Sequence, residues 1–264
     1  MMPGQLADRA VLAISGVEAK AFLQGLVTND ISKLAPGAPL YAALLTPQGK
    51  ILFDFLLSEN DGTIFLDCAA GSAQSLLKRL TLYRLRAKVE IATRHDLGVC
   101  WGEAGAPDPR LPEFGLRRIG AVTHTDCSAE YLAHRLSLGV PEGVDFGSDK
   151  MFALDAGLEE LHGVSFGKGC YIGQELTARM KHRGTARKRL LPIYALGGSA
   201  LPGAGTEVRS GNLALGELVS IYGAHGFALI RLDRWSEVGD QAVHAAESEI
   251  SISKPAWLAS ATAT

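Results

Sequence analysis

The chain has 264 residues, of which 47% are hydrophobic and 20% are charged, and its net charge at pH 7 is −2. This is the composition of a globular protein, and the length predicts two or three packed units. The small net charge argues against nucleic acid as a partner. We find no secretory leader and no run near the ~20 apolar residues of a membrane helix, so we expect no membrane association.

The cysteine pattern argues against two further classes of site. The four cysteines are widely spaced and form no Cys-x-x-Cys pair; they are Cys68, Cys100, Cys127 and Cys170. Such spacing argues against a disulfide framework and against a closed set of zinc or iron–sulfur ligands within one chain. We therefore expect a reducing compartment and no resident metal.

The first 100 residues predict alternating strands and helices. Segment 11–14 is strand-like, and Ser15 with Glu18 fits a capping box that begins a helix. Ser72 is expected to open a second helix, whose leucines have core spacing. The further predicted strands cover 41–46, 51–57, 63–68 and 88–91, with a turn at 47–50.

The middle of the chain predicts two helices after an irregular stretch. Residues 102–120 are rich in glycine and proline and predict a surface connection with one hairpin. Residues 126–138 predict a helix that Ser128 caps and Gly139 ends. Residues 149–161 predict another helix, ended by Gly163.

From Lys188 the pattern changes to short apolar strands separated by glycines. This pattern is typical of a small all-β unit. The clearest predicted strands are 190–196, 206–209, 213–222 and 227–232.

The most informative stretch runs from Gly167 to Glu175. It places Cys170 beside glycines and near Lys168, just before a segment that predicts a helix from Gly173. A helix N-terminus and a nearby cation both favour the reactive thiolate. Two alternatives stand beside this interpretation: a buried structural cysteine and a lysine that is merely a solvated loop residue.

This motif and the segments around it resemble a known family. Residues 168–175, Arg179 and the segment 182–190 resemble the signature of the YgfZ-type folate-binding proteins, which are relatives of the glycine-cleavage T-protein, an aminomethyltransferase. The resemblance is greatest to the subgroup that contains the mitochondrial iron–sulfur cluster assembly factor of this family. It extends to segments 14–17, 22–26, 28–30, 45–50, 83–89 and 161–166, and is weakest at 97–125 and beyond 240.

The resemblance implies an α+β fold and a function. It implies a folate-binding body of two interleaved α/β subdomains over 1–187 and a small C-terminal β-barrel over 188–264. It also implies a tetrahydrofolate-binding factor for the assembly or repair of iron–sulfur clusters in client enzymes. Cys170 would act transiently, with Lys168 beside it, and the partners would be a folate and iron–sulfur assembly proteins or client enzymes. The expected compartment is cytoplasmic in a bacterium and the mitochondrial matrix in a eukaryote.

Seven further residues are candidates for holding the folate: Asn29, Asp30, Gln48, Lys50, Gln174, Glu175 and Arg179. The first four also have an explanation as turn residues. Glu175 and Arg179 have the favourable i,i+4 spacing of a helical ion pair. The basic run 179–189 suits either the acidic tail of a folate or a solvated face.

One departure from the family pattern is the sequence Gly157-Leu158-Glu159, where relatives often carry an asparagine first. The lost amide puts one contact, to the pterin or to the backbone, in doubt. The T-protein also places acidic residues around its folate, and Asp155 or Glu160 is a candidate for that role, with the polar face of a helix as the alternative for each.

Two other functions stay open on the sequence alone. One is a folate-dependent transferase that moves a one-carbon unit, as the T-protein does. The other is a thiol hydrolase, which would need His162 or His182 oriented onto Cys170. The sequence does not decide whether the protein has turnover.

Overall fold

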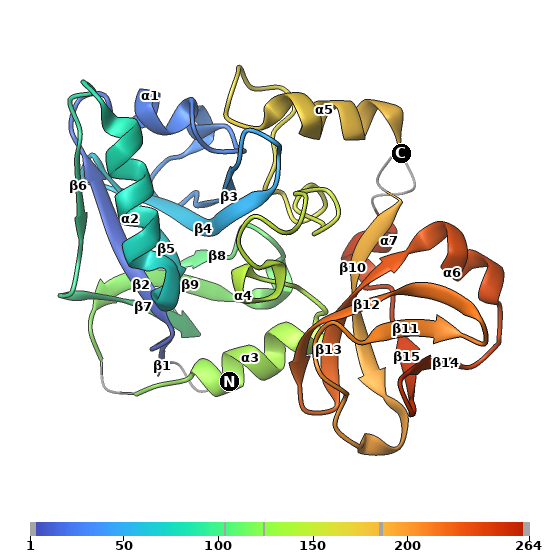
Figure 1. Cartoon of the computed structure of the whole chain (residues 1–264). Coiled ribbons are helices and arrows are strands. Elements are labelled where there is room, and N and C mark those ends of the chain that lie inside the picture. Colours follow the sequence, from blue (N-terminus) through green and yellow to red (C-terminus); the bar gives the residue numbers. More distant parts are fainter. Residues whose placement is uncertain (1–3, 103, 124, 185–186, 261–264) are drawn as a thin grey trace.

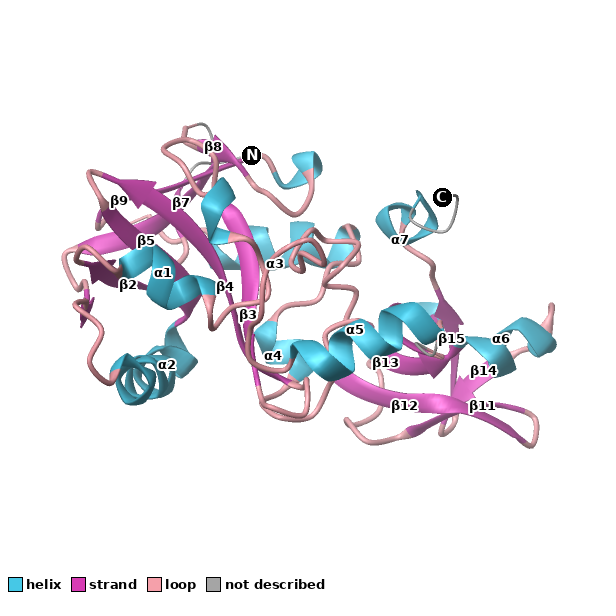
Figure 2. Ribbon diagram, turned by 90° about the horizontal axis from the view of Figure 1, so that it is seen from above, coloured by secondary structure: helices cyan, strands magenta, loops and turns pink. Residues whose placement is uncertain are grey.

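The computed structural model describes residues 4–102, 104–123, 125–184 and 187–260. An α/β body precedes a C-terminal barrel, and the helix α5 (Gln174–Arg183) lies between them in the chain and extends from the body toward the barrel (Figure 1; Figure 2). The predicted α+β class with a terminal barrel is confirmed. Thr185 and Ala186 of the family motif lie outside the described residues.

The first sheet of the body has five antiparallel strands and carries two helices on one face (Figure 1). Its apolar residues pack against α1 (Ala19–Gln24) and α2 (Ala70–Arg84) to form one core. The strand order is β3 (Leu40–Leu45), β4 (Ile51–Asn60), β5 (Thr63–Ala69), β2 (Arg9–Ser15) and β6 (Glu90–Thr93).

Two helix starts in this half differ from prediction. The predicted capping box is wrong because Ser15 ends strand β2 and α1 begins only at Ala19. The Glu18 carboxylate instead accepts a hydrogen bond of 2.5 Å from the backbone N–H of Lys88. Helix α2 begins at Ala70, earlier than the predicted Ser72.

The second sheet interleaves with the first along the chain. Its strand order is β1 (Gly4–Gln5), β7 (Leu97–Gly102), β9 (Leu116–Ala121) and β8 (Ala106–Pro107). The chain therefore begins in the four-stranded sheet with β1, forms the five-stranded sheet with β2 to β6, and returns to the four-stranded sheet with β7 to β9. A short 3-10 turn, η2 (Pro112–Phe114), and the helix α3 (Ser128–Ser137) complete this subdomain. Asp126 accepts hydrogen bonds from Ser128, so Ser128 is not the cap that we predicted.

The segment 102–120 is more than the predicted surface connection. The hairpin within this range is the antiparallel pair β8–β9, and β9 also pairs with β7, which lies almost wholly before the range. Between these strands, Arg110 is fully buried and its guanidinium pairs with Asp108 at 2.7 Å and Glu142 at 2.6 Å. The guanidinium carbon Cζ of Arg110 also lies 4.3 Å from the centre of the Phe114 ring. A buried charge needs such partners, so this network organises the interior of the body.

The predicted helix over 149–161 is wrong. This segment is a series of tight turns in which Asp149 and Gly157 have φ values of +57° and +77°, and His162 follows with +58°. Positive φ values are incompatible with a right-handed helix, whatever the spacing of the apolar side chains. The segment instead bonds to the start of β4, where the Ile51 N–H donates to the Met151 carbonyl at 2.8 Å.

The C-terminal barrel is closed by six strands. β10 pairs with β13 and β15, and the ring continues through β12, β11 and β14. The strands predicted from residue 190 onward correspond to β10 to β13, whereas β14 and β15 were not predicted. The elements are β10 (Lys188–Ala195), η3 (Leu196–Gly198), β11 (Glu207–Ser210), β12 (Leu213–Tyr222), β13 (His225–Arg231), α6 (Leu232–Val238), β14 (Val243–Ala245), β15 (Ser248–Ile252) and α7 (Ala256–Ser260).

A buried carboxylate joins the barrel to the body. Asp145 lies in the short helix α4 (Gly143–Phe146) and pairs with Arg135 of α3 at 2.6 Å. Its other oxygen accepts hydrogen bonds from Ser220 and Tyr222 of β12, at 2.6 and 2.7 Å. The barrel is therefore fixed against the body by polar contacts as well as by a shared apolar core.

Candidate functional site

Lys168 anchors the cysteine motif to the N-terminal half of the body. Its ammonium group donates hydrogen bonds of 2.7 Å to the carbonyl oxygens of Val27 and Asn29. The residue is only 7% exposed, and burial lowers the pKa of its ammonium group to about 8, against an opposing effect of Asp30. The alternative of a solvated loop lysine is therefore wrong.

The motif around Asn29 binds the approach to the cysteine loop. The Asn29 amide donates to the carbonyls of Tyr41 and His162, at 2.7 and 2.8 Å. The Thr28 hydroxyl donates to the Gly163 carbonyl at 2.6 Å. The contacts to His162 and Gly163 join segments more than 130 residues apart in the sequence. The two hydrogen bonds of the Asn29 amide account for its burial without a ligand.

The turn 46–50 packs against the start of α5. Gly173 precedes the helix at a φ of +82°, and a Cβ atom there would lie 2.5 Å from the Thr46 carbonyl oxygen. Gly49 is close to the same point, since a Cβ on it would lie 3.3 Å from the Gly173 carbonyl oxygen. Glycine is required at Gly173 both by the backbone angle and by this approach. Three sequence motifs thus meet around the cysteine loop.

Cys170 is the exposed cysteine of the four. It lies in the loop before α5, and the alternative of a buried structural cysteine is wrong. Cys68, Cys100 and Cys127 are buried, and burial raises the pKa of the Cys68 thiol to about 12 and also raises that of Cys127. Among the described hydrogen bonds, none joins Cys170 to a histidine, so the geometry offers no support for a thiol hydrolase.

The remaining predicted residues lie at the edges of this cluster. Asp30 accepts hydrogen bonds from Ser32 and Gln24, and those from Ser32 are the main reason that its pKa is lowered. The Lys50 ammonium donates to the Asp149 carbonyl at 3.3 Å. Gln48, Glu175 and Arg179 are exposed, and Gln174 is half-buried. The expected Glu175–Arg179 pair does not occur among the ion pairs of the described residues.

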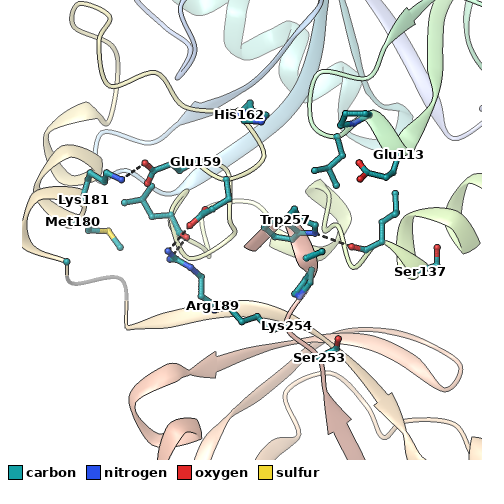
Figure 3. A pocket seen from close by; sticks show the side chains of 18 residues that line it. Glu113, Ser137, Glu159, His162, Met180, Lys181, Arg189, Ser253, Lys254 and Trp257 are labelled. Atoms are coloured by element: carbon teal, nitrogen blue, oxygen red, sulfur yellow. Dashed lines mark hydrogen bonds and ion pairs between the residues drawn. The ribbon is translucent and has the colours of Figure 1, made fainter. Parts of the chain in front are cut away.

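A large cleft lies elsewhere, between the body, the C-terminal half of α5 and the barrel (Figure 3). Its volume is about 1180 Å³. Lys181 and Glu159 form an ion pair on one side, and Trp257 lies across from them, where its indole N–H donates to the Leu138 carbonyl at 3.1 Å (Figure 3). None of the nine predicted site residues is part of its lining.

Glu160 is the most informative residue of the cleft wall. One of its carboxylate oxygens pairs with Arg189 at 3.0 Å, and the other is buried with no hydrogen-bond partner. Arg189 also donates to the Leu154 carbonyl at 2.6 Å. Behind the wall, burial raises the pKa of Asp155 to about 6, although Arg189 and Lys188 oppose the shift. An unpartnered buried acceptor beside a cleft requires an explanation, and a donor from a ligand supplies one.

The departure at Gly157 has a structural explanation. A Cβ on Gly157 would lie 2.9 Å from two ring carbons of Trp257. The indole therefore occupies the space that an asparagine side chain would need. Trp257 was not predicted as a site residue, because nothing near it in the sequence marks a site.

The cysteine loop and the cleft are two separate sites at opposite ends of α5. Cys170 precedes the helix, whereas Met180 and Lys181 of its last turns line the cleft. Ten helical residues span about 15 Å. Within the described residues, no group of three or more histidine, cysteine or acidic side chains is arranged to hold a metal ion.

Comparison with known proteins shows the family of this chain. The human iron–sulfur cluster assembly factor IBA57, mitochondrial, is 34% identical over 309 residues, which cover 96% of this chain and 84% of the human protein. The chain belongs to the IBA57 family. The IBA57 homologues of Mycosarcoma maydis and Neurospora crassa are 34% and 32% identical over 74% and 75% of this chain. The chain spans just over half of these two fungal proteins, 57% and 54%.

Two further comparisons agree with the architecture. The family model "CAF17, C-terminal beta-barrel domain" matches residues 187–260. The glycine cleavage system aminomethyltransferase T from Bartonella henselae has the same fold, with a TM-score of 0.72 at 16% identity, over 97% of this chain and 85% of that one. The predicted resemblance to T-protein relatives is thus confirmed for the fold, and the IBA57 relatives quoted above are named iron–sulfur cluster assembly factors.

The IBA57 relatives also bear on localisation. The relatives quoted above are named mitochondrial, which agrees with the mitochondrial alternative and not with the cytoplasmic one. In the described part of the chain, no helix combines the length and the apolar composition that crossing a membrane requires.

Proposed function

We propose that this chain is a folate-binding iron–sulfur cluster assembly or repair factor in which Cys170 is the reactive group. The observation that carries the proposal is the exposed thiol in a loop that Lys168 fixes to Val27 and Asn29. One thiolate does not hold a cluster alone, because clusters take four ligands. The remaining ligands would come from a partner, either an assembly protein or a client enzyme.

A reduced folate suits the cleft better than the predicted loop residues. The cleft is larger than the ~300–1,000 Å³ of typical small-molecule sites and is lined by both apolar and charged residues. The free oxygen of Glu160 would accept a hydrogen bond from the N–H edge of the pterin, and Trp257 would give it an apolar wall. Lys181 and Lys254 would attract the acidic tail. Bound tetrahydrofolate would supply nitrogen atoms that accept or donate a one-carbon unit.

Two variants separate the thiol from the folate. In a strain lacking the endogenous protein, Cys170→Ala is expected to fold, to bind tetrahydrofolate and to leave iron–sulfur enzymes inactive. Glu160→Gln is expected to keep an exposed Cys170 and to bind tetrahydrofolate at least about tenfold more weakly by calorimetry. Full complementation by Cys170→Ala would refute the thiol role, and equal folate affinity of Glu160→Gln would refute the assignment of the cleft.

The transferase alternative rests on the fold shared with the aminomethyltransferase. Incubation with tetrahydrofolate and an aminomethyl donor tests it. Methylenetetrahydrofolate formation that survives Cys170→Ala would favour the transferase, and no formation would favour the assembly factor.

A further inference from the structure

A corner of the body far from both sites carries an unusual concentration of positive charge. The segment 70–89, which contains α2 and the turn after it, has no acidic residue although the whole chain carries a net charge of −2. Its basic side chains are all exposed, and none of them takes part in the ion pairs or side-chain hydrogen bonds of the described residues. They are Lys78, Arg79, Arg84, Arg86 and Lys88, and we name this surface the basic corner.

Apolar side chains project from the same corner. Leu82 is 69% exposed and Leu85 is 87% exposed, and both lie among the basic residues. Val17, which is 89% exposed, lies between Gly16 and Glu18, and both of these residues contact Lys88. Of the six large apolar residues that are strongly exposed in the described chain, three therefore occur here. Exposed apolar groups that cluster mark an interaction site more often than single ones.

The backbone of the corner is strained at Leu85 and closed by hydrogen bonds. Leu85 has a φ of +45° and a ψ of −105°, which is unfavourable for a side chain with a Cβ. The turn is closed by a hydrogen bond of 2.8 Å from the Ala87 N–H to the Arg84 carbonyl, and Glu18 holds the Lys88 N–H. A strained backbone lowers stability, and so do exposed leucines and unpaired like charges. An ordinary solvated surface does not combine all three, as this corner does.

The shape of the corner favours a polypeptide as the occupant. Helix α2 buries Ala73, Leu76 and Leu80 against the sheet, so Lys78 and Leu82 face outward, one turn apart. Beside them a recess of about 590 Å³ is lined by Ser15, Gly16 and residues 84–90. Such a recess admits an apolar side chain. Its lining contains three cations, Arg84, Arg86 and Lys88, and one carboxylate, Glu90, so its excess of positive charge matches the carboxylates of a partner. A nucleic acid would call for exposed aromatic faces, and the only aromatic residue of segment 70–89, Tyr83, is half-buried.

We propose that the basic corner docks an acidic amphipathic segment of a partner protein, with apolar side chains of that segment against Leu82, Leu85 and Val17. The proposal goes beyond the proposed function and does not depend on it. In Figure 1 the end of α2 and strand β6 lie on the side of the body away from the barrel, so a partner bound there leaves the cleft uncovered.

The test uses the full chain and a designed probe. The probe is a fluorescein-labelled helical peptide of about 16 residues, with glutamates on one face and leucines at i, i+3, i+4 and i+7. We expect binding in fluorescence anisotropy that weakens at least about tenfold for the variant Arg84→Gln/Arg86→Gln/Lys88→Gln. The matched control Lys33→Gln/Lys150→Gln/Arg209→Gln removes the same charge from scattered exposed sites and is expected to bind within about twofold of the unmodified chain.

Leu85→Gly separates docking from folding. Glycine tolerates the positive φ, so the thermal midpoint is expected to be unchanged or higher, while peptide affinity falls about threefold or more. Equal binding by all variants, or equal losses in the corner and control variants, would overturn the proposal. Tighter binding of anionic vesicles or of a single-stranded RNA, with the same dependence on the corner, would also overturn it, because the surface would then serve a membrane or nucleic acid.

Discussion

The ammonium nitrogen of Lys168 lies 2.7 Å from the carbonyl oxygen of Asn29, although 139 residues separate them in the chain. The same nitrogen donates to Val27. A loop that carries a reactive group is usually mobile, and here one lysine fixes it to the core of the first subdomain. The arrangement makes Lys168 a structural residue first, whatever it contributes to the thiol.

Removing this lysine is expected to destabilise the protein. Lys168→Met keeps the apolar stem but leaves two buried carbonyl groups without donors, which should lower the free energy of unfolding by about 1–3 kcal/mol. Urea denaturation measures the loss. The exposed Lys33→Met is the control and should change stability by less than about 0.5 kcal/mol. Equal stabilities of the two variants would show that the hydrogen bonds of Lys168 contribute little.

The pKa of Lys168 gives a pH dependence with a definite sign. Its folded pKa of about 8 lies below the ordinary value of 10.5. Between these values the unfolded chain binds more protons, so this residue makes the free energy of unfolding rise as the pH is raised from 8 to 10.5. The difference between the unmodified protein and Lys168→Met should therefore grow over this range. A difference that shrinks would show that the buried amine has no lowered pKa.

Asp155 gives the opposite dependence at acidic pH. Burial raises its folded pKa to about 6, above the ordinary 3.8, so the folded protein binds more protons between these values. The contribution of Asp155 to the free energy of unfolding therefore falls between pH 4 and pH 6. Above pH 6 the carboxylate is ionised in the folded protein and the full destabilisation is present. Asp155→Asn should stabilise the protein at pH 7.5 by about 1–3 kcal/mol and by much less near pH 4. Thermal melts at pH 7.5 and pH 4 would detect this difference, with Asp240→Asn as the exposed control. Equal stabilisation by Asp155→Asn at the two pH values would contradict the raised pKa.

Thiol labelling should single out Cys170. It is exposed, whereas Cys68 is buried and its thiol has a pKa of about 12. Iodoacetamide at neutral pH should modify Cys170 at least about tenfold faster than each of the other three cysteines. Mass-spectrometric mapping of a time course measures the four rates. Labelling of Cys170 only after denaturation would exclude it as the reactive group.

The buried network around Arg110 should be intolerant of single substitutions. Arg110→Met leaves the carboxylates of Asp108 and Glu142 without their main cation, and we expect a loss of about 3–5 kcal/mol. The exposed neighbour Arg118→Met should cost less than about 0.5 kcal/mol. Chemical denaturation of both variants compares them directly. A small loss in Arg110→Met would mean that the carboxylates find protons or water instead.

The regular elements were predictable where a side-chain pattern repeats. Apolar runs bounded by turn residues gave the strands that became β4 and β12, and leucine spacing gave the helix α2, whose start was placed two residues late. The pattern failed at 149–161, because apolar spacing says nothing about the positive φ values that turn this segment back on itself. The predicted barrel lacked β14 and β15, whose three and five residues are too short to show a period.

The site was predictable only in its local part. The glycines, Cys170 and the helix after Gly173 are neighbours in the sequence, so their relation could be inferred from it. The partners of Lys168 and the ring that faces Gly157 come from distant segments, and no local pattern reports such contacts. For the same reason the charged residues of 102–120 were taken as surface residues, although Arg110 and Arg117 are buried among distant acids.

The barrel is complete before the described chain ends. β15 finishes at Ile252, and the residues after it build the wall of the cleft that carries Trp257. A premature stop codon just beyond Ile252 would leave all six strands paired but would remove Trp257 and Leu258, which are buried in the core that the barrel shares with the body. The shortened protein would lack the indole that lies over Gly157. Such a truncation should therefore damage the cleft wall and the packing between barrel and body, while the strands of the barrel itself keep their partners.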